Sequence, residues 1–246
     1  FSALRSFADE LHHTGVVMPS LFIGHGSPMN GIEDNEFSRT WTEMAKQIPV
    51  PKAVIVISAH WLTKGTNITA MDFPKTIHDF GGFPKELFEV EYPAKGSPDL
   101  AKETKKLVKN TSIELGHDWG LDHGAWTVIR HMYPEANIPV LQISIDYTKE
   151  MKYHYALAKE LSELRKKGVL IIGSGNLVHN LGMVALNARM QHERNYDDAE
   201  LAKRNLPVKA SNLKLKPPLG WFPTVLNAPM TSLNMLLKMS TPRWLL

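Results

Sequence analysis

The apolar residues of this chain follow two kinds of pattern, continuous runs and runs with helical spacing. Continuous runs, such as the four apolar residues at 54–57, are typical of strands buried on both faces of a parallel sheet. Predicted strands cover residues 17–23, 53–58, 67–71, 139–145 and 169–172. Predicted helices cover residues 1–15, 37–45, 98–109, 126–132 and 149–167. This alternation indicates βαβ units, and it predicts a three-layer α/β fold with a mostly parallel central sheet and helices on both faces.

Residues with strong positional preferences mark the ends of several predicted helices. Asn35 or Asp34 is suited to cap the helix that follows it, because both side chains accept hydrogen bonds from free N–H groups. Pro98 suits the first turn of the next helix. Gly168 fits the C-terminal cap of the long helix before it, where a left-handed backbone is common.

A single catalytic domain over residues 1–246 is expected, because no repeat, low-complexity tract or linker interrupts the first 185 residues. Residues 1–15 form an N-terminal helix in this prediction. Residues 196–246 have no clean apolar period, and we expect a divergent or incomplete tail there.

Composition narrows the class of protein. The net charge is +3 and basic residues are mixed with acidic ones, which argues against nucleic acid as a partner. No apolar run reaches the roughly 18–20 residues that span a bilayer, so no membrane partner is expected. The chain contains no cysteine, which excludes disulfides, thiolate metal sites and a cysteine nucleophile. A cytoplasmic enzyme is expected, with its oligomeric state left open.

Three histidines follow predicted buried strands. His25, His60 and His179 each come directly or shortly after such a run. The carboxyl ends of parallel strands meet at one edge of a sheet, where a rigid framework aims side chains into a crevice. Imidazole binds zinc, iron, copper and nickel, and a catalytic site needs about three protein ligands. The pattern therefore predicts a metal site.

Two further histidines lie beside aspartates. His123 follows Asp122, and such a neighbour raises the pKa of an imidazole or fixes its tautomer where the geometry permits. This placement favours acid/base chemistry or substrate orientation. His78 is a second candidate in the aromatic segment of residues 76–84, which is either a wall over a pocket or a tight turn with packed aromatics.

The sequence lacks the motifs of several enzyme classes. Residues 173–175 read Gly-Ser-Gly without the third glycine of a dinucleotide fingerprint, and there is no P-loop or Gly-x-Ser-x-Gly elbow. The Gly-His-Gly at residues 24–26 also lacks the arginine that a phosphohistidine phosphatase needs.

Five segments resemble one family in order and content. They are Gly-His-Gly-Ser-Pro-Met-Asn from residue 24, Ser-Ala-His-Trp from 58, Thr-Ile-His-Asp-Phe from 76, Asp-His-Gly-Ala-Trp from 122 and Gly-Ser-Gly-Asn-Leu-Val-His-Asn from 173. Together these segments resemble the 4,5-DOPA extradiol dioxygenases, within the class III extradiol ring-cleavage dioxygenases. The resemblance covers residues 19–186.

This resemblance implies one α/β domain with one non-haem divalent metal, Fe(II) for activity, while Zn(II) can also be bound. His25 and His60 match metal ligands. His179 matches a ligand in one branch of the class and an acid/base group in another, and His123 matches a histidine beside the substrate. The implied reaction cleaves the ring of a small aromatic diol, such as a DOPA-like catechol, with O2.

The aromatic side chains near these motifs suit a flat substrate. His78, Phe80 and Trp126 are assigned to substrate binding, although core packing explains the aromatic residues equally well. Family members also carry a Thr-Pro-Glu-His-Tyr-Leu-Pro-like segment with a further ligand, and no histidine follows His192 here. The alternatives are a zinc-dependent hydrolase that uses the same histidines, or a metal-binding module that has lost activity.

Overall fold

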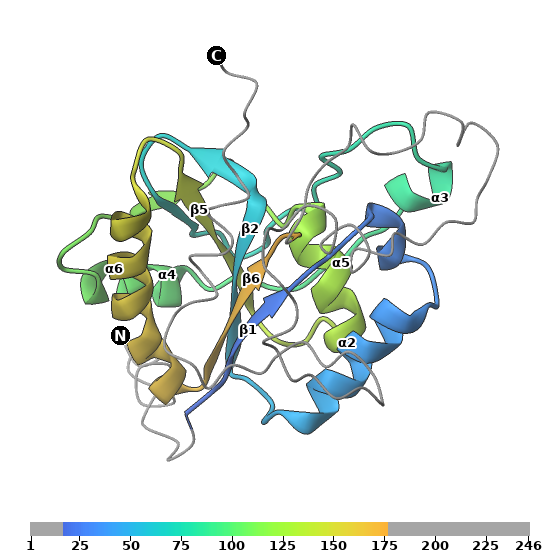
Figure 1. The fold of residues 1–246 in the computed structure, drawn as a ribbon, viewed down its shortest axis with the longest axis horizontal. Coiled ribbons are helices and arrows are strands. Elements are labelled where there is room, and N and C mark those ends of the chain that lie inside the picture. The colour runs from blue at the N-terminus through green and yellow to red at the C-terminus, as the bar shows by residue number, and fades with distance from the viewer. Residues whose placement is uncertain (1–16, 177–246) are drawn as a thin grey trace, which may run out of the picture.

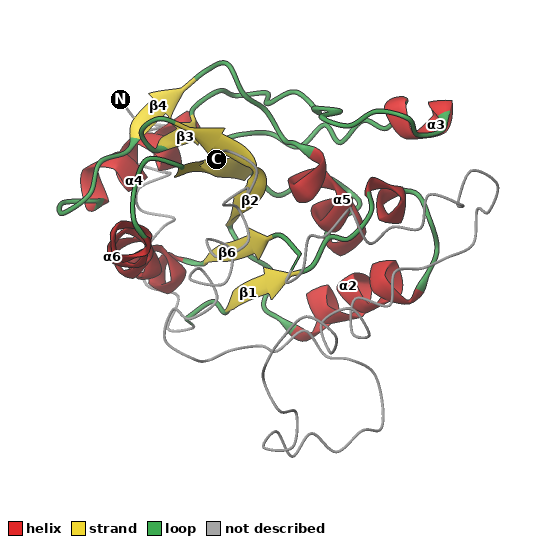
Figure 2. Cartoon of the chain, turned by 45° about the horizontal axis from the view of Figure 1, so that its top comes forward, coloured by secondary structure: helices red, strands yellow, loops and turns green. Residues whose placement is uncertain are grey.

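The computed structural model describes residues 17–176 of the chain, and the structural statements below refer to those residues. Six strands form one sheet in the order β1-β6-β2-β5-β3-β4 (Figures 1 and 2). Four of the five neighbouring pairs are parallel, and β3 pairs antiparallel with β5. The strands are β1 (Ser20–Ile23), β2 (Ala53–Thr63), β3 (Asn67–Thr69), β4 (Glu114–Gly116), β5 (Val140–Asp146) and β6 (Val169–Ser174).

Helices cover both faces of this sheet, so the predicted three-layer α/β fold is confirmed (Figures 1 and 2). On one face lie α2 (Glu36–Gln47) and α5 (His123–Met132), and on the other lie α4 (Pro98–Leu107) and α6 (Met151–Leu161). The remaining helical segments are η1 (Pro28–Gly31), α3 (Lys85–Phe88) and η2 (Ser162–Lys167).

Strand β2 shows why the sheet needs cover on both sides. Its side chains alternate between the faces, so that Val54 and Val56 pack with α2 and α5, whereas Ile55 and Ile57 pack with α4 and α6. All four side chains are buried. A continuous apolar run is therefore the pattern that this central position requires.

Several predicted boundaries were wrong. The strand predicted at residues 53–58 extends to Thr63, with a shift of its register against β5 between Ile57 and Leu62. The helix predicted at 149–167 is α-helical only in α6 and ends as the tighter η2. Gly168 closes it in a left-handed conformation with φ of 87°, as predicted. The short elements β4 and α3 were not predicted.

Three parts of the prediction lie outside the described residues: the helix at residues 1–15, His179, and the tail at 196–246. Within residues 17–176, no helix has both the length and the hydropathy needed to cross a bilayer.

Asn35 caps α2 and provides a test of the predicted helix start. Its side chain accepts hydrogen bonds from the backbone N–H groups of Phe37 and Ser38, at 3.0 and 3.1 Å. Asn35→Ala should lower the free energy of unfolding by about 1 kcal/mol, because two N–H groups lose their acceptor. Urea denaturation measures this loss, and Asp34→Ala, at the exposed neighbour, should change stability by less than about 0.5 kcal/mol. Equal effects of the two substitutions would contradict the cap.

Candidate metal centre

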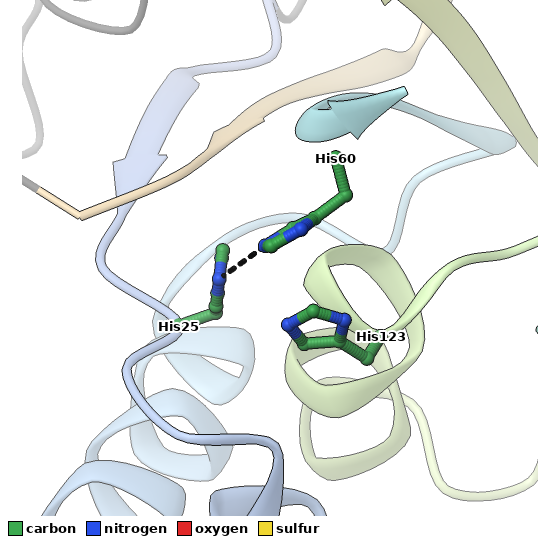
Figure 3. Close-up of side chains that lie close together, drawn as sticks. All are labelled: His25, His60 and His123. Carbon is green, nitrogen blue, oxygen red and sulfur yellow. Dashed lines mark hydrogen bonds between the residues drawn. The ribbon is translucent and has the colours of Figure 1, made fainter. Parts of the chain in front are cut away.

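Three histidines from separate elements converge at the carboxyl end of the sheet. His25 lies two residues after β1, His60 lies in the last part of β2, and His123 is the first residue of α5 (Figure 3). One ring nitrogen from each lies within 4.8 Å of those of the other two. The structure thus brings together two predicted ligands, His25 and His60, and adds His123 to them.

Two asparagine side chains hydrogen-bond to the loop that carries His25. The Asn30 side chain donates a hydrogen bond to the carbonyl of His25 at 3.0 Å, and the Asn176 side chain accepts one from the Gly26 N–H at 2.8 Å. Gly26 has φ of +64°, and a Cβ there would lie 2.7 Å from Asn30. Glycine is therefore needed for this turn, and the turn buries His25 to 2% exposure.

A serine on β6 determines which nitrogen of His25 carries a hydrogen. The Ser174 hydroxyl lies 2.9 Å from His25 Nδ1, and it also donates a hydrogen bond to the carbonyl of Gly124. A hydroxyl has one hydrogen to donate, and a carbonyl can only accept. Ser174 therefore accepts from Nδ1–H of His25, so the lone pair of this imidazole lies on Nε2.

The contact between His25 and His60 fits a bound cation. Their Nε2 atoms lie 3.0 Å apart, as the dashed line in Figure 3 marks. Two nitrogen lone pairs at this distance repel one another unless a cation or a proton lies between them. Two imidazole nitrogens that bind one metal at about 2.0–2.1 Å would lie roughly 3–3.5 Å apart, a range that includes the observed distance. These residues therefore fit a zinc or iron site.

A glycine brings the third imidazole into the group. A Cβ at Gly124 would lie 3.0 Å from the ring of His60 and would also clash with the Ser58 hydroxyl. Glycine thus allows the first turn of α5 to approach β2 closely. The result is a distance of 3.9 Å between the ring centroids of His60 and His123.

Asp79 accepts hydrogen bonds from His123, a pairing that the sequence pattern did not predict. Its Oδ1 accepts hydrogen bonds from both Nδ1 and the backbone N–H of His123, each at 2.9 Å, and its Oδ2 lies 3.5 Å from Nδ1 of His60. Burial alone would raise the pKa of Asp79. The hydrogen bonds from His123 and the charges of His123 and His60 outweigh that effect and lower the pKa to about 2. A carboxylate in the loop before α3 thus faces two site histidines.

Asp122, the sequence neighbour of His123, has a different role from the predicted one. Its side chain accepts hydrogen bonds from the N–H of Ala125 at 3.2 Å and from the Gln142 amide at 2.8 Å, so that it caps α5 and ties the helix to β5. The side chain is fully buried, and burial together with nearby Asp79 raises its pKa. Asp122 therefore fixes the position of His123 through the helix start.

The aromatic residues assigned to substrate binding fall into two groups. Phe80 lies edge-on to the His123 ring, with 5.6 Å between centroids. Trp126 is fully buried behind it and donates a hydrogen bond from Nε1 to the carbonyl of Ile77. His78 is tied to the carbonyl of Val90 at 3.0 Å. Phe80 is thus the one of these three with a ring contact to a site histidine, while His78 and Trp126 hold its loop in place.

The family described as the catalytic LigB subunit of aromatic ring-opening dioxygenase matches residues 17–204. This chain belongs to the LigB family. It is 49% identical over 168 residues to a 4,5-DOPA dioxygenase extradiol of Escherichia coli K12, covering 68% of this chain and 62% of that protein. It is 41% identical over 169 residues to a Beta vulgaris protein of the same name, covering 66% and 63%.

One solved structure has the same fold as this LigB-family chain. An uncharacterised Escherichia coli K12 protein, known from its crystal structure, shares the fold with a TM-score of 0.62 and 35% identity, over 91% of this chain and 88% of that one. The alignments to the curated relatives cover less than two thirds of their length.

Ser174 offers a test of the metal centre in this LigB-family chain. Ser174→Ala removes the acceptor for Nδ1–H of His25, and we expect Zn(II) affinity to fall by about 10–100-fold, the usual cost of losing a hydrogen-bond partner of a ligand. Competition with a chromophoric chelator measures this change. Ser144→Ala is the matched control, because it removes another buried serine hydroxyl, bonded to the N–H of Asn67, from strand β5. Equal Zn(II) affinity in the two variants would contradict the role of Ser174.

Proposed function

We propose that this chain is an extradiol dioxygenase that opens the ring of a catechol beside its two hydroxyl groups, with O2 and a non-haem metal. The observation that carries the proposal is the 3.0 Å approach of His25 and His60, with His123 beside them, in a LigB-family chain. The names of the curated relatives support a DOPA-like catechol as the substrate.

Each site residue has a role in this proposal. His25 and His60 hold the metal through Nε2, and His179 supplies a further ligand or a proton-transfer group from outside the described residues. Bound Fe(II) would supply the redox chemistry that lets O2 react with the aromatic ring. The protein then has to orient the catechol and move its protons.

His123 is placed to move a proton of the substrate. His123 is 5% exposed and its ring centroid lies 3.9 Å from that of His60, so a catechol held at the metal centre would meet it. An imidazole exchanges protons near neutral pH, as removal of a catechol proton requires. Phe80 borders the same ring and offers an apolar edge to the aromatic substrate.

Oxygen uptake tests the proposed reaction. The full chain is loaded with Fe(II) without air, and L-DOPA and oxygen are then added. Consumption of O2 in equal amount to L-DOPA, with a yellow ring-opened product, is the expected result. Absence of uptake by protein that holds Fe(II) would contradict the proposal. The Zn(II) form is the control, because zinc has no redox chemistry; ester hydrolysis by that form would favour the hydrolase instead.

A further inference from the structure

Asp79 contacts two of the three site histidines, and the two come from different elements. His60 belongs to β2 and His123 to α5, while Asp79 lies in the loop between β3 and α3. Its Oδ1 accepts from Nδ1 of His123 at 2.9 Å, and its Oδ2 lies 3.5 Å from Nδ1 of His60. The side chain is 17% exposed, so little water competes for these contacts.

The chemistry of a carboxylate gives the direction of the hydrogen bond with His123 and the preferred tautomer of His60. An ionised carboxylate can only accept hydrogen bonds, so the bond at 2.9 Å places the hydrogen of His123 on Nδ1, and the 3.5 Å contact favours the same tautomer for His60. The neutral form of each ring then has its lone pair on Nε2. Hydrogen bonds at a catalytic site are often long before the ligand binds, and we expect the 3.5 Å distance to His60 to shorten in the complex.

We propose that Asp79 is a positioning residue that holds His60 and His123 as Nδ1–H tautomers, so that both rings direct Nε2 toward the metal centre. Ser174 imposes the same tautomer on His25. A shared tautomer explains how rings from a loop, a strand and a helix present equivalent atoms to one point. The consequence for catalysis rests on the proposed function, but the tautomers themselves do not.

The effect of Asp79→Asn can be predicted because the neighbouring N–H group of His123 determines how the new amide is oriented. The backbone N–H of His123 points at the Oδ1 position from 2.9 Å, and this group can only donate. The amide oxygen must therefore occupy that position, which leaves the NH2 group facing Nδ1 of His60. A hydrogen bond from this NH2 group to Nδ1 of His60 would place the hydrogen of His60 on Nε2, whereas His123 keeps its original tautomer.

Nitrogen-15 NMR of the imidazole rings reads the tautomers directly. We measure the Zn(II)-loaded full chain at about pH 8, above the usual imidazole pKa of about 6.5. The bound cation removes the repulsion between the facing Nε2 lone pairs of His25 and His60. Wild type should show hydrogen on Nδ1 of both His60 and His123. Asp79→Asn should show it on Nε2 of His60 alone, and Zn(II) affinity should fall by about 10–100-fold. Asp72→Asn, at an exposed aspartate earlier in the same segment, should change neither result.

The wild-type spectrum alone can overturn the proposal. Hydrogen on Nε2 of His60 or His123 in the wild type would do so, even if the asparagine variant failed to fold. An unchanged His60 tautomer in folded Asp79→Asn would overturn it as well. Because the spectra need no catechol and no oxygen, a chain that showed the expected tautomers but cleaved no catechol would refute the proposed function and not this inference.

Discussion

His25→Ala is expected to yield a folded protein that retains no tightly bound metal. The Nε2 atoms of His25 and His60 lie 3.0 Å apart, so loss of the His25 ring removes one of the two imidazoles that would hold a cation between them. Metal affinity should fall by more than the 10–100-fold that loss of a hydrogen-bond partner costs. Turnover of L-DOPA should fall to the level of metal-free protein.

Metal analysis after gel filtration measures this result, and circular dichroism checks the fold. His154→Ala is the matched control, because His154 is also a buried histidine, held through Nε2 by the carbonyl of Asp146 on the opposite face of the sheet. That variant should keep its metal even where its stability falls. Unchanged metal content in folded His25→Ala would show that the ligand assignment is wrong.

The strands that the sequence predicted well are those whose apolar runs face helices on both sides. Residues 53–57 of β2 and 169–172 of β6 are of this kind. Because both faces of these strands are covered, every position must be apolar, and the sequence shows a continuous apolar run. β4 is three residues long and carries the exposed Glu114, so its pairing with β3 is decided by tertiary contact. The extension of β2 past Ser58 likewise depends on the shifted register with β5.

The convergence of the candidate metal-site residues was partly predictable for the same reason. His25 and His60 follow buried runs, and the parallel sheet brings the ends of those runs together. The approach of His123 depends on how closely α5 packs against β2 at Gly124, which no apolar period encodes.

The partner of His123 was not predictable from its sequence neighbour. Asp122 precedes His123, but a residue at the N-cap turns its side chain back onto the N–H groups of its own helix. The actual partner, Asp79, is 44 residues away and reaches the ring through a loop. Sequence adjacency to a histidine at a helix start is thus poor evidence for an ion pair.

His123→Ala is expected to keep the metal and to lose most of the turnover. His123 lies beside the facing rings of His25 and His60, with its Nδ1 bonded to Asp79 and its ring against Phe80, where a bound catechol would be placed. Loss of a proton-transfer group typically lowers the rate by about 10²–10⁴-fold. We expect kcat to fall within that range while Fe(II) content equals that of wild type.

The same variant separates two roles that the geometry allows for His123. Because its ring nitrogen lies within 4.8 Å of those of His25 and His60, it is near enough to act as a ligand itself. If it is a ligand, His123→Ala should lose metal together with turnover, as His25→Ala does. If it transfers protons, metal content stays and the dependence of kcat on pH loses one of its limbs. His117→Ala, at an exposed histidine six residues earlier, should leave metal content, kcat and pH profile unchanged.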